Sequence, residues 1–155
     1  MGNIIIINRG LTMKVDAVTE KEVKEVLNLY AKFYQEKDLD SLLNLCAPNQ
    51  DLIFIGAGED EWVQGWDEIK KGFKRDLEQA DEIKIDYGSL NISASGPVAW
   101  NSSTMHMEVV VDDEKVILKG RLSMILEKRE DKWLIVHLHF SMPSSDQKAG
   151  QSYPV

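Results

Sequence analysis

The sequence predicts an α+β fold, with helices in the first half of the chain and antiparallel strands in the second. Three observations predict it. Apolar residues recur at helical spacing in three segments before residue 81, and after it they alternate with a period of two. The phase of that alternation flips at Gly88, which is typical of a β-bulge, and a bulge bends a sheet. We therefore expect three helices on the concave face of a curved antiparallel sheet, forming a cone with one open end.

The three helices have recognisable starts and ends. Thr19 and Glu22 fit a capping box at the start of the first helix. The second lies in "DLDSLLNLCAP", with Asp38 or Asp40 as its N-cap and Pro48 after it. A short strand, "DLIFIG", then precedes the third helix, "GWDEIKKGFKRDLEQA". That helix carries an apolar row on one face, formed by Ile69, Phe73 and Leu77.

Four long strands follow the third helix. The first contains the flip and ends at the turn Gly96-Pro97. The next three are expected at 98–111, 115–128 and 133–142, joined by a hairpin turn at Asp112-Asp113 and by the segment "REDK".

The length and composition indicate one domain at 19–143, with an N-terminal extension at 1–18 and a polar tail at 144–155. The net charge of −8 disfavours binding to nucleic acid or to an anionic membrane surface. No apolar run approaches the roughly 18 residues that span a bilayer, and the N-terminal segment lacks the features of a signal peptide. The single Cys46 excludes an internal disulfide and favours a reducing compartment, so we expect a cytoplasmic protein.

The order of elements over roughly 19–143 resembles the nuclear transport factor 2-like superfamily. The segment "FIGAGEDEWVQGWDEI" resembles the part of SnoaL-like proteins that runs from the first strand into the third helix. The segment "DKWLIVHLHFSMP" resembles the last strand of SnoaL-like domains and the end of the calcium/calmodulin-dependent protein kinase II association domain. The resemblance implies a conical α+β fold, usually a homodimer, with a pocket inside the cone. Members include steroid isomerases, polyketide cyclases, dehydratases and proteins that only bind or assemble, so it implies no single function.

Alternation assigns the residues of each strand to two faces of the sheet. In the last strand one face is apolar from Leu134 to Met142, and the other is mixed. The helices must cover apolar surface, so we expect the apolar face to be the concave one. Two histidines on the mixed face could share a metal or be a solvated pair, but no third ligand is apparent and we predict no metal. We expect four residues of the convex face at a dimer interface: Arg121, Trp133, His137 and His139.

The concave face is expected to line an apolar pocket for a small molecule. Among the candidate ligand contacts given below, the tyrosine, the two tryptophans and the histidine could instead be residues of the hydrophobic core. We interpret Tyr34 and Trp66 as core residues. The residues expected to contact a ligand are Tyr30, Trp62, Trp100, Ser102, Thr104, His106, Met124, Leu138 and Phe140.

A comparison with the steroid isomerases tests the catalytic hypothesis. Those enzymes use a carboxylate base, with a tyrosine and a protonated aspartic acid bonding the enolate oxygen. Tyr30 falls at the position of their tyrosine, but the base position falls near Phe54 or Ile55 and the second acid near Leu122 or Ser123. Only one of the three roles is retained, which disfavours an isomerase of that type.

Two residues remain as candidate acids or bases, His106 and Glu61. Three hypotheses of function therefore stay open. The protein is a homodimer that binds a small apolar molecule, or a lyase, isomerase or cyclase that acts on a small hydrophobic substrate, or an oligomeric assembly module with a vestigial pocket. We expect no cofactor, and neither nucleic acid nor a membrane as partner.

Overall fold

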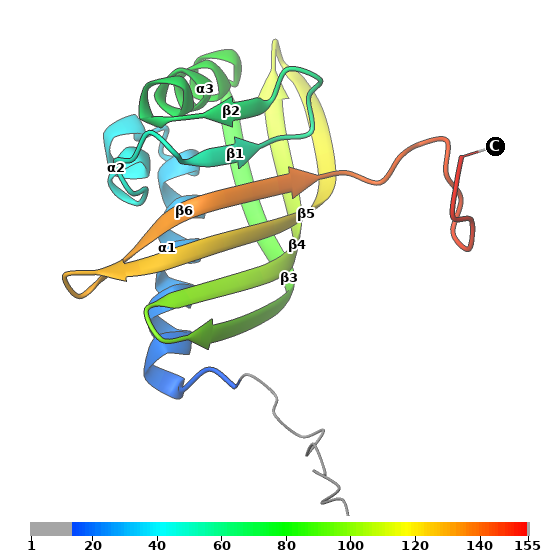
Figure 1. Ribbon diagram of the computed structural model, residues 1–155. Helices are drawn as coiled ribbons and strands as arrows, with labels where there is room; N and C mark the ends of the chain where they lie inside the picture. Colours follow the sequence, from blue (N-terminus) through cyan, green and yellow to red (C-terminus); the bar gives the residue numbers. More distant parts are fainter. Residues whose placement is uncertain (1–13, 155) are drawn as a thin grey trace, which may run out of the picture.

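The computed structural model describes residues 14–154, in which a curved six-stranded sheet carries the helices on its concave side (Figure 1). The sheet order is β2-β1-β6-β5-β4-β3, and neighbouring strands are antiparallel except β1 and β6, which are parallel. The predicted α+β fold is confirmed. The elements are α1 (Ala17–Gln35), α2 (Leu39–Asn44), β1 (Ile53–Ile55), β2 (Trp62–Gln64), α3 (Trp66–Gln79), β3 (Glu82–Ser95), β4 (Val98–Val111), β5 (Glu114–Arg129) and β6 (Lys132–Ser141).

The predicted N-terminal extension falls, up to residue 13, outside the described residues. The predicted tail contains no helix or strand over residues 144–154. None of the helices in the described part of the chain is long and apolar enough to cross a membrane.

Helix α1 begins earlier than the capping box predicts. The Asp16 carboxylate accepts hydrogen bonds from the backbone N–H groups of Val18 and Thr19, at 3.0 and 2.9 Å, so Asp16 is the N-cap. The predicted capping box is therefore wrong. Glu22 reaches the sheet instead, where it accepts a hydrogen bond from the indole N–H of Trp133 at 2.7 Å.

Helix α3 begins and ends close to its predicted limits, whereas α2 ends at Asn44, ahead of the predicted end at Pro48. The side chain of Asp38 accepts a hydrogen bond from the backbone N–H of Ser41 at 3.0 Å, which decides the N-cap of α2. The predicted row of Ile69, Phe73 and Leu77 in α3 is buried. Strand β2 is not predicted; it pairs with β1 and forms a short hairpin before α3.

Within the described residues, the long strands carry two register shifts. The first lies between Tyr87 and Leu90 in β3, as the flip at Gly88 predicts. The second lies in β6 and is not predicted. There Ile125 pairs with His137. The residue after Ile125 in β5 pairs with the residue two positions before His137, so β6 has one extra residue there. This extra residue reverses the alternation of β6.

The reversal places Trp133 on the concave side, so its predicted position on the dimer face is wrong. Its side chain is buried, and the Lys128 ammonium lies 5.6 Å from its ring centroid. The same ammonium pairs with the Glu22 carboxylate at 2.9 Å. His137 and His139 follow the bulge and keep the predicted outward direction.

The hydrophobic core fills one end of the cone, which we call the closed end. It contains the fully buried Leu126 and Ile135 of the sheet, covered by Leu27 of α1 and Leu42 of α2. Cys46 lies beside them, paired with β6 through an isolated bridge. Burial raises the pKa of the Cys46 thiol to about 12, so this thiol is an unreactive part of the core.

Candidate functional site

The opposite end of the cone, the open end, is hollow. A cavity of about 480 Å³ lies between α1, α3, the β1–β2 hairpin and the far ends of the long strands. Its wall is predominantly apolar and includes Phe73 from α3 and Met105, Met107 and Val109 from β4. A cavity of this size and lining suits a small, mostly apolar molecule.

Aromatic rings pack where α1 and α3 meet at this cavity. The ring centroids of Tyr30 and Tyr34 are 5.0 Å apart, and Phe73 lies 5.7 Å from Tyr34 and from Phe54. Burial raises the pKa of Tyr30 and of Tyr34 well above the ordinary tyrosine value. Both hydroxyl groups therefore stay protonated at neutral pH and are available as hydrogen-bond donors.

A partly buried carboxylate faces this aromatic cluster, since the side chain of Asp76 is 42% exposed. The hydroxyl of Tyr34 donates a hydrogen bond to Oδ2 of Asp76 at 3.0 Å. Burial raises the pKa of Asp76 above its ordinary value, and the hydrogen bond from Tyr34 opposes the rise in part. The result is an acidic group held at the wall of an apolar cavity.

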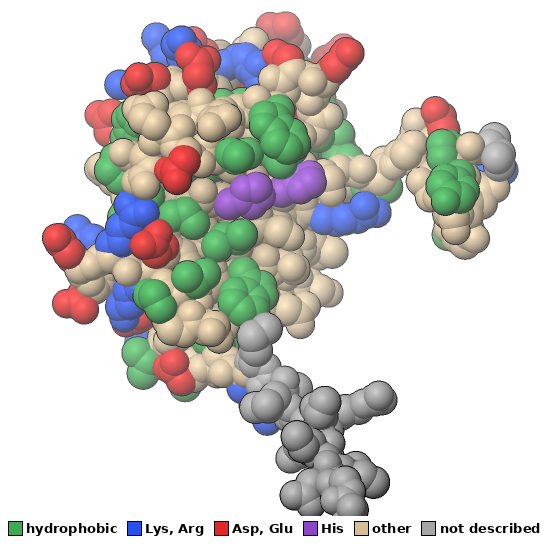
Figure 2. Space-filling model, viewed as in Figure 1, with side chains coloured by type: hydrophobic (Ala, Val, Ile, Leu, Met, Phe, Trp, Pro, Cys, Tyr) green, Lys and Arg blue, Asp and Glu red, His purple; other side chains and the backbone are tan. Residues whose placement is uncertain are grey.

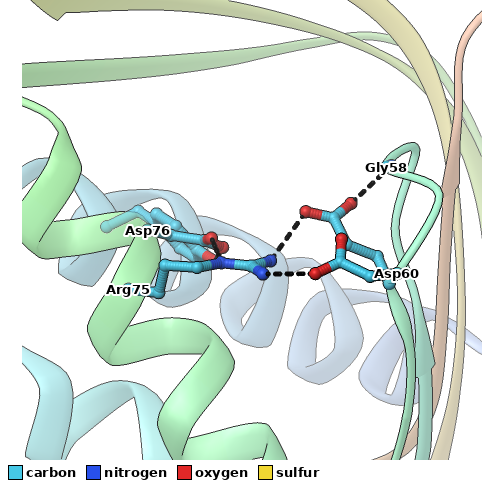
Figure 3. A network of polar contacts seen from close by, with 6 residues as sticks. Gly58, Asp60, Arg75 and Asp76 are labelled. Carbon is cyan, nitrogen blue, oxygen red and sulfur yellow. Dashed lines mark hydrogen bonds and ion pairs between the residues drawn. The ribbon is translucent and has the colours of Figure 1, made fainter.

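The neighbouring Arg75 ties α3 to the loop between β1 and β2 (Figure 3). Its guanidinium lies 2.9 Å from Oε1 of Glu61 and 3.3 Å from Oδ2 of Asp60. The other oxygen of Glu61 accepts a hydrogen bond from the backbone N–H of Gly58 at 2.7 Å. A side chain at Gly58 would crowd the Glu61 carboxyl carbon, 2.9 Å from the new Cβ. The loop therefore wraps closely around Glu61 and holds it against Arg75.

In the cavity wall, the ring of Phe140 packs directly against a glycine. Its ring lies over Gly120 of β5, so closely that a Cβ on Gly120 would collide with the ring and with the backbone of Ser141. The missing side chain thus lets an aromatic ring lie flat on the sheet inside the cavity.

The cavity brings together some of the predicted site residues. Tyr30, Leu138 and Phe140 line it, as does the acid–base candidate Glu61. Met124 faces the same side of the sheet but is fully buried in the core. Contact of these residues with a ligand stays a prediction.

The predicted inward direction is wrong for four β4 residues. The two-residue turn pairs Val111 with Glu114, and hence Ser103 with Leu122. Directly paired residues share a face, and Leu122 lines the cavity, so Ser103 points inward and its neighbours along the strand point outward. The misplaced residues, which lie on the convex face, are Trp100, Ser102, Thr104 and His106. His106 is therefore removed from the acid–base candidates of the cavity.

Trp62 is also misplaced by the sequence analysis. Its neighbours Glu61 and Val63 line the cavity, but the Trp62 side chain is 69% exposed and does not. Ile55 pairs with Trp62 on one side and with His139 on the other, so the three residues share a row on the convex face.

The convex face carries the two histidines of the predicted dimer interface. Figure 2 shows histidine side chains among apolar side chains on this face. Its exposed apolar residues include Trp62 and Ile125, the latter paired with His137. Arg121 is exposed on the same strand, β5. Burial, and then the neighbouring His139, lower the pKa of His137. Among the described residues, no group of His, Cys, Asp and Glu side chains could hold a metal ion.

A comparison with protein-family models identifies the family. The model for the SnoaL-like domain matches residues 23–145. The chain belongs to the SnoaL-like domain family. No curated protein matches this SnoaL-like chain.

Solved structures agree in fold with this SnoaL-like domain. A nuclear transport factor 2-like superfamily protein from Salmonella enterica has a TM-score of 0.78 at 21% identity, covering 88% of this chain and 98% of that one. A protein from Novosphingobium aromaticivorans, provisionally assigned as a scytalone dehydratase, has a TM-score of 0.74 at 15% identity, with coverages of 89% and 93%. An NTF2-like protein of unknown function from Pseudomonas putida has a TM-score of 0.75 at 14% identity, with coverages of 90% and 99%. At these identities the likeness establishes the fold.

Of the charged residues in the cavity wall, only Glu61 is predicted from the sequence. The sequence does not single out Asp76 or Arg75, and it favours a core role for Tyr34. A signal for Asp76 exists, because it stands at i+3 from Phe73 and i+7 from Ile69. A carboxylate in the apolar stripe of an amphipathic helix is at least partly buried at the helix interface unless the stripe ends there. No comparable signal marks Arg75.

Proposed function

We propose that this protein binds a small, mostly apolar molecule in the cavity at the open end of the cone. The observation that carries the proposal is the cavity itself, about 480 Å³ with a predominantly apolar wall. Membership of the SnoaL-like family supports it, since such domains enclose a pocket of this kind.

The lining favours a ligand that is held by contact area rather than by charge. Phe73 and Val109 offer rigid apolar surface, while Met105 and Met107 have flexible thioether side chains that adapt to a ligand's shape. Removing apolar ligand surface from water contributes about 25 cal/mol per Å². Shape and apolar area should therefore dominate the affinity.

The test is a titration with Nile red, a neutral dye whose fluorescence rises in apolar surroundings. We expect the wild type to enhance the emission with saturation at one dye per chain. Val109→Trp fills the cavity from β4 and should abolish the enhancement. Val110→Trp is the matched control, because Val110 is the adjacent residue on the other face of β4 and does not line the cavity.

Equal enhancement by the wild type and Val109→Trp would contradict the proposal, because the dye would then bind elsewhere. A loss of enhancement with Val110→Trp alone would place the dye on the convex face and contradict it as well. Native mass spectrometry of protein purified from its own host is the complementary measurement, and we expect a retained mass that Val109→Trp does not carry.

A second candidate function is acid–base catalysis on the bound molecule. The observation that favours it is Asp76, a partly buried carboxylate with a raised pKa beside the Tyr34 hydroxyl. The likeness to the provisionally assigned scytalone dehydratase also favours it. Incubating a host metabolite extract with the wild type and with Asp76→Asn tests it by mass spectrometry. A compound consumed by the wild type alone supports catalysis, and identical extracts contradict it.

We also propose that the convex face joins two copies of the chain. Trp62 is 69% exposed and Ile125 is 40% exposed on a face that also carries His137 and His139. Large exposed apolar side chains with polar groups among them are typical of a protein–protein interface. Sedimentation velocity measures the mass directly; a monomer at about 100 μM protein would contradict the dimer, since that exceeds typical dissociation constants of specific interfaces.

A further inference from the structure

We infer that the bound molecule carries a hydrogen-bond donor, either a hydroxyl or an ammonium group, on an otherwise apolar body, and that Asp76 accepts this hydrogen bond. The inference rests on the proposed binding function and names the chemical class of the ligand. It depends on three features of the cavity wall, which are a free acceptor, the balance of charge and the cost of covering a half-exposed carboxylate with a ligand.

The free acceptor is Oδ1 of Asp76. Oδ2 already accepts the hydrogen bond from the Tyr34 hydroxyl at 3.0 Å. The closest cationic nitrogen to Oδ1 is Nε of Arg75 at 3.8 Å, which is beyond hydrogen-bond distance. Oδ1 accepts no hydrogen bond from the described residues, and Asp76 belongs to the cavity wall. A donor on a ligand can therefore bind there without displacing a protein contact.

The balance of charge argues against an anionic ligand. The charged residues in the wall are Glu61, Arg75 and Asp76, two acids and one base. The guanidinium of Arg75 is already engaged by Glu61 at 2.9 Å and by Asp60 at 3.3 Å. A carboxylate, sulfate or phosphate on the ligand would meet net negative charge and no unpaired cation. A neutral or positive group meets neither obstacle.

Covering of Asp76 by the ligand supplies the driving force for the contact, because a molecule in the cavity removes water from a carboxylate side chain that is 42% exposed. A carboxylate removed from water loses hydration that a single hydrogen bond from Tyr34 replaces only in part. A second donor on Oδ1 restores more of that loss, and a charged donor restores more than a neutral one. Hydroxyl and ammonium groups share this chemistry, so the experiment has to separate them.

The test uses four probes that share one apolar body. Butylbenzene has no head group, and butylphenol, butylbenzylammonium and butylbenzoate carry theirs in the para position. Their affinities for the wild type are measured by calorimetry at neutral pH, where the phenol is uncharged. We expect at least one of the two donors to bind about tenfold more tightly than butylbenzene, or about 1.4 kcal/mol. Butylbenzoate should bind more weakly than butylbenzene. The tighter of the two donors identifies the hydroxyl or the ammonium source.

Two variants of Asp76 separate charge from hydrogen bonding. Asp76→Leu removes the acceptor, so both donors should fall to within about twofold of butylbenzene. Asp76→Asn keeps one acceptor oxygen but removes the charge, so it should lower the preference for the ammonium more than that for the phenol. Asp86→Asn is the control, because it makes the same change of charge at an exposed position of β3 outside the cavity. Unchanged binding of butylbenzene shows that each variant keeps the cavity intact.

Three results would overturn the inference. Butylbenzoate could bind the wild type as tightly as the donors, Asp76→Leu could retain the donor preference, or Asp86→Asn could lose it. If butylbenzene binds and a donor adds nothing, the head-group inference fails while the proposed binding function stands. If none of the four probes binds and Nile red binding is unaffected by Val109→Trp, the binding function itself fails.

Discussion

The closed and open ends of the cone share one sheet but use it differently. At the closed end, α2 and α1 cover β5 and β6, and Leu126 is fully buried. At the open end, the same strand β5 carries Leu118, which is only half-buried and lines the cavity. The position of the helices, rather than a change in the strands, thus decides whether apolar side chains form a core or a pocket wall.

The two ends also shift the pKa of a carboxyl group in opposite directions. At the closed end, hydrogen bonds from Lys128 and Trp133 lower the pKa of Glu22. At the open end, burial raises the pKa of Asp76. Ionisation of Glu22 therefore stabilises the folded state, whereas ionisation of Asp76 destabilises it at neutral pH. We interpret the first as a structural tie and the second as a group reserved for a ligand.

The same substitution at both ends of β5 should give the largest contrast. Leu126→Ala removes fully buried atoms and should lower the free energy of unfolding by about 3 kcal/mol. Leu118→Ala removes atoms that already face the cavity and should lower it by about 1 kcal/mol. Urea denaturation of the two variants measures both losses. Equal losses would show that the open end is packed as tightly as the closed one.

Loss of the tie at the closed end should have the next largest effect. Because the pKa of Glu22 is lowered in the folded state, its stabilisation is present above the ordinary value of 4.5 and is lost as pH falls through the lowered pKa. Glu22→Gln should therefore unfold at lower temperature than the wild type near pH 7, and the difference should shrink toward about pH 3. Thermal unfolding across this range measures it, with the exposed Glu25→Gln on the same helix as control. A difference that does not depend on pH would contradict the role of the charge.

A smaller effect of opposite sign is expected at the open end. Because the pKa of Asp76 is raised in the folded state, stability decreases as pH rises from below the ordinary value of 3.8 through the raised pKa. Asp76→Asn should keep the hydrogen bond from Tyr34 without the partly buried charge. It should therefore melt at higher temperature than the wild type near pH 7 and match it at about pH 3. A lower melting temperature at neutral pH would show that the carboxylate is a structural tie like Glu22.

The smallest effect should lie outside the cone, on the convex face. The pKa of His137 is lowered from its ordinary value of 6.5, so the neutral form persists to lower pH, and protonation opposes association as pH falls through the lowered pKa. In the proposed dimer we expect a modest loosening between about pH 7.5 and about pH 5.5. Sedimentation velocity of the wild type and of the double variant His137→Gln/His139→Gln measures it, with His106→Gln as control. The same response in all three proteins would show that the two histidines do not govern association.

The fold could be predicted because its signals are local. The helical spacing of Ile69, Phe73 and Leu77 and the flip at Gly88 each appear within a few residues of sequence. The bulge in β6 carries no such signal. It falls within "LIVHLHF", where apolar residues stand on both faces and no glycine marks the break. Strict alternation then misplaces Trp133.

The orientation of β4 could have been predicted correctly from the sequence. A two-residue turn at Asp112-Asp113 fixes the register of the hairpin, and both residues have positive φ angles, 50° and 64°, as a tight hairpin turn requires. Counting back from that turn pairs Leu122 with Ser103 and places His106 outside. The polar site is different, because Tyr34 and Asp76 stand 42 residues apart and meet only when α1 packs against α3. No pattern within either helix predicts that contact.

Because the Phe140 ring lies so close to Gly120, a substitution at Gly120 requires a substitution at Phe140. Any side chain at Gly120 collides with the ring, so Phe140 is compatible only with glycine there. Among relatives with this strand pairing, a larger residue at the glycine position should accompany a smaller one at the aromatic position, together with a shift of the β6 backbone, because the carbonyl oxygen of Ser141 lies 2.7 Å from the added Cβ. Such a paired exchange would move bulk from β6 to β5 across the cavity floor and change the shape of the chamber while conserving its volume. Ligand specificity can thus change among relatives through paired substitutions at these two positions, without any change to the helices.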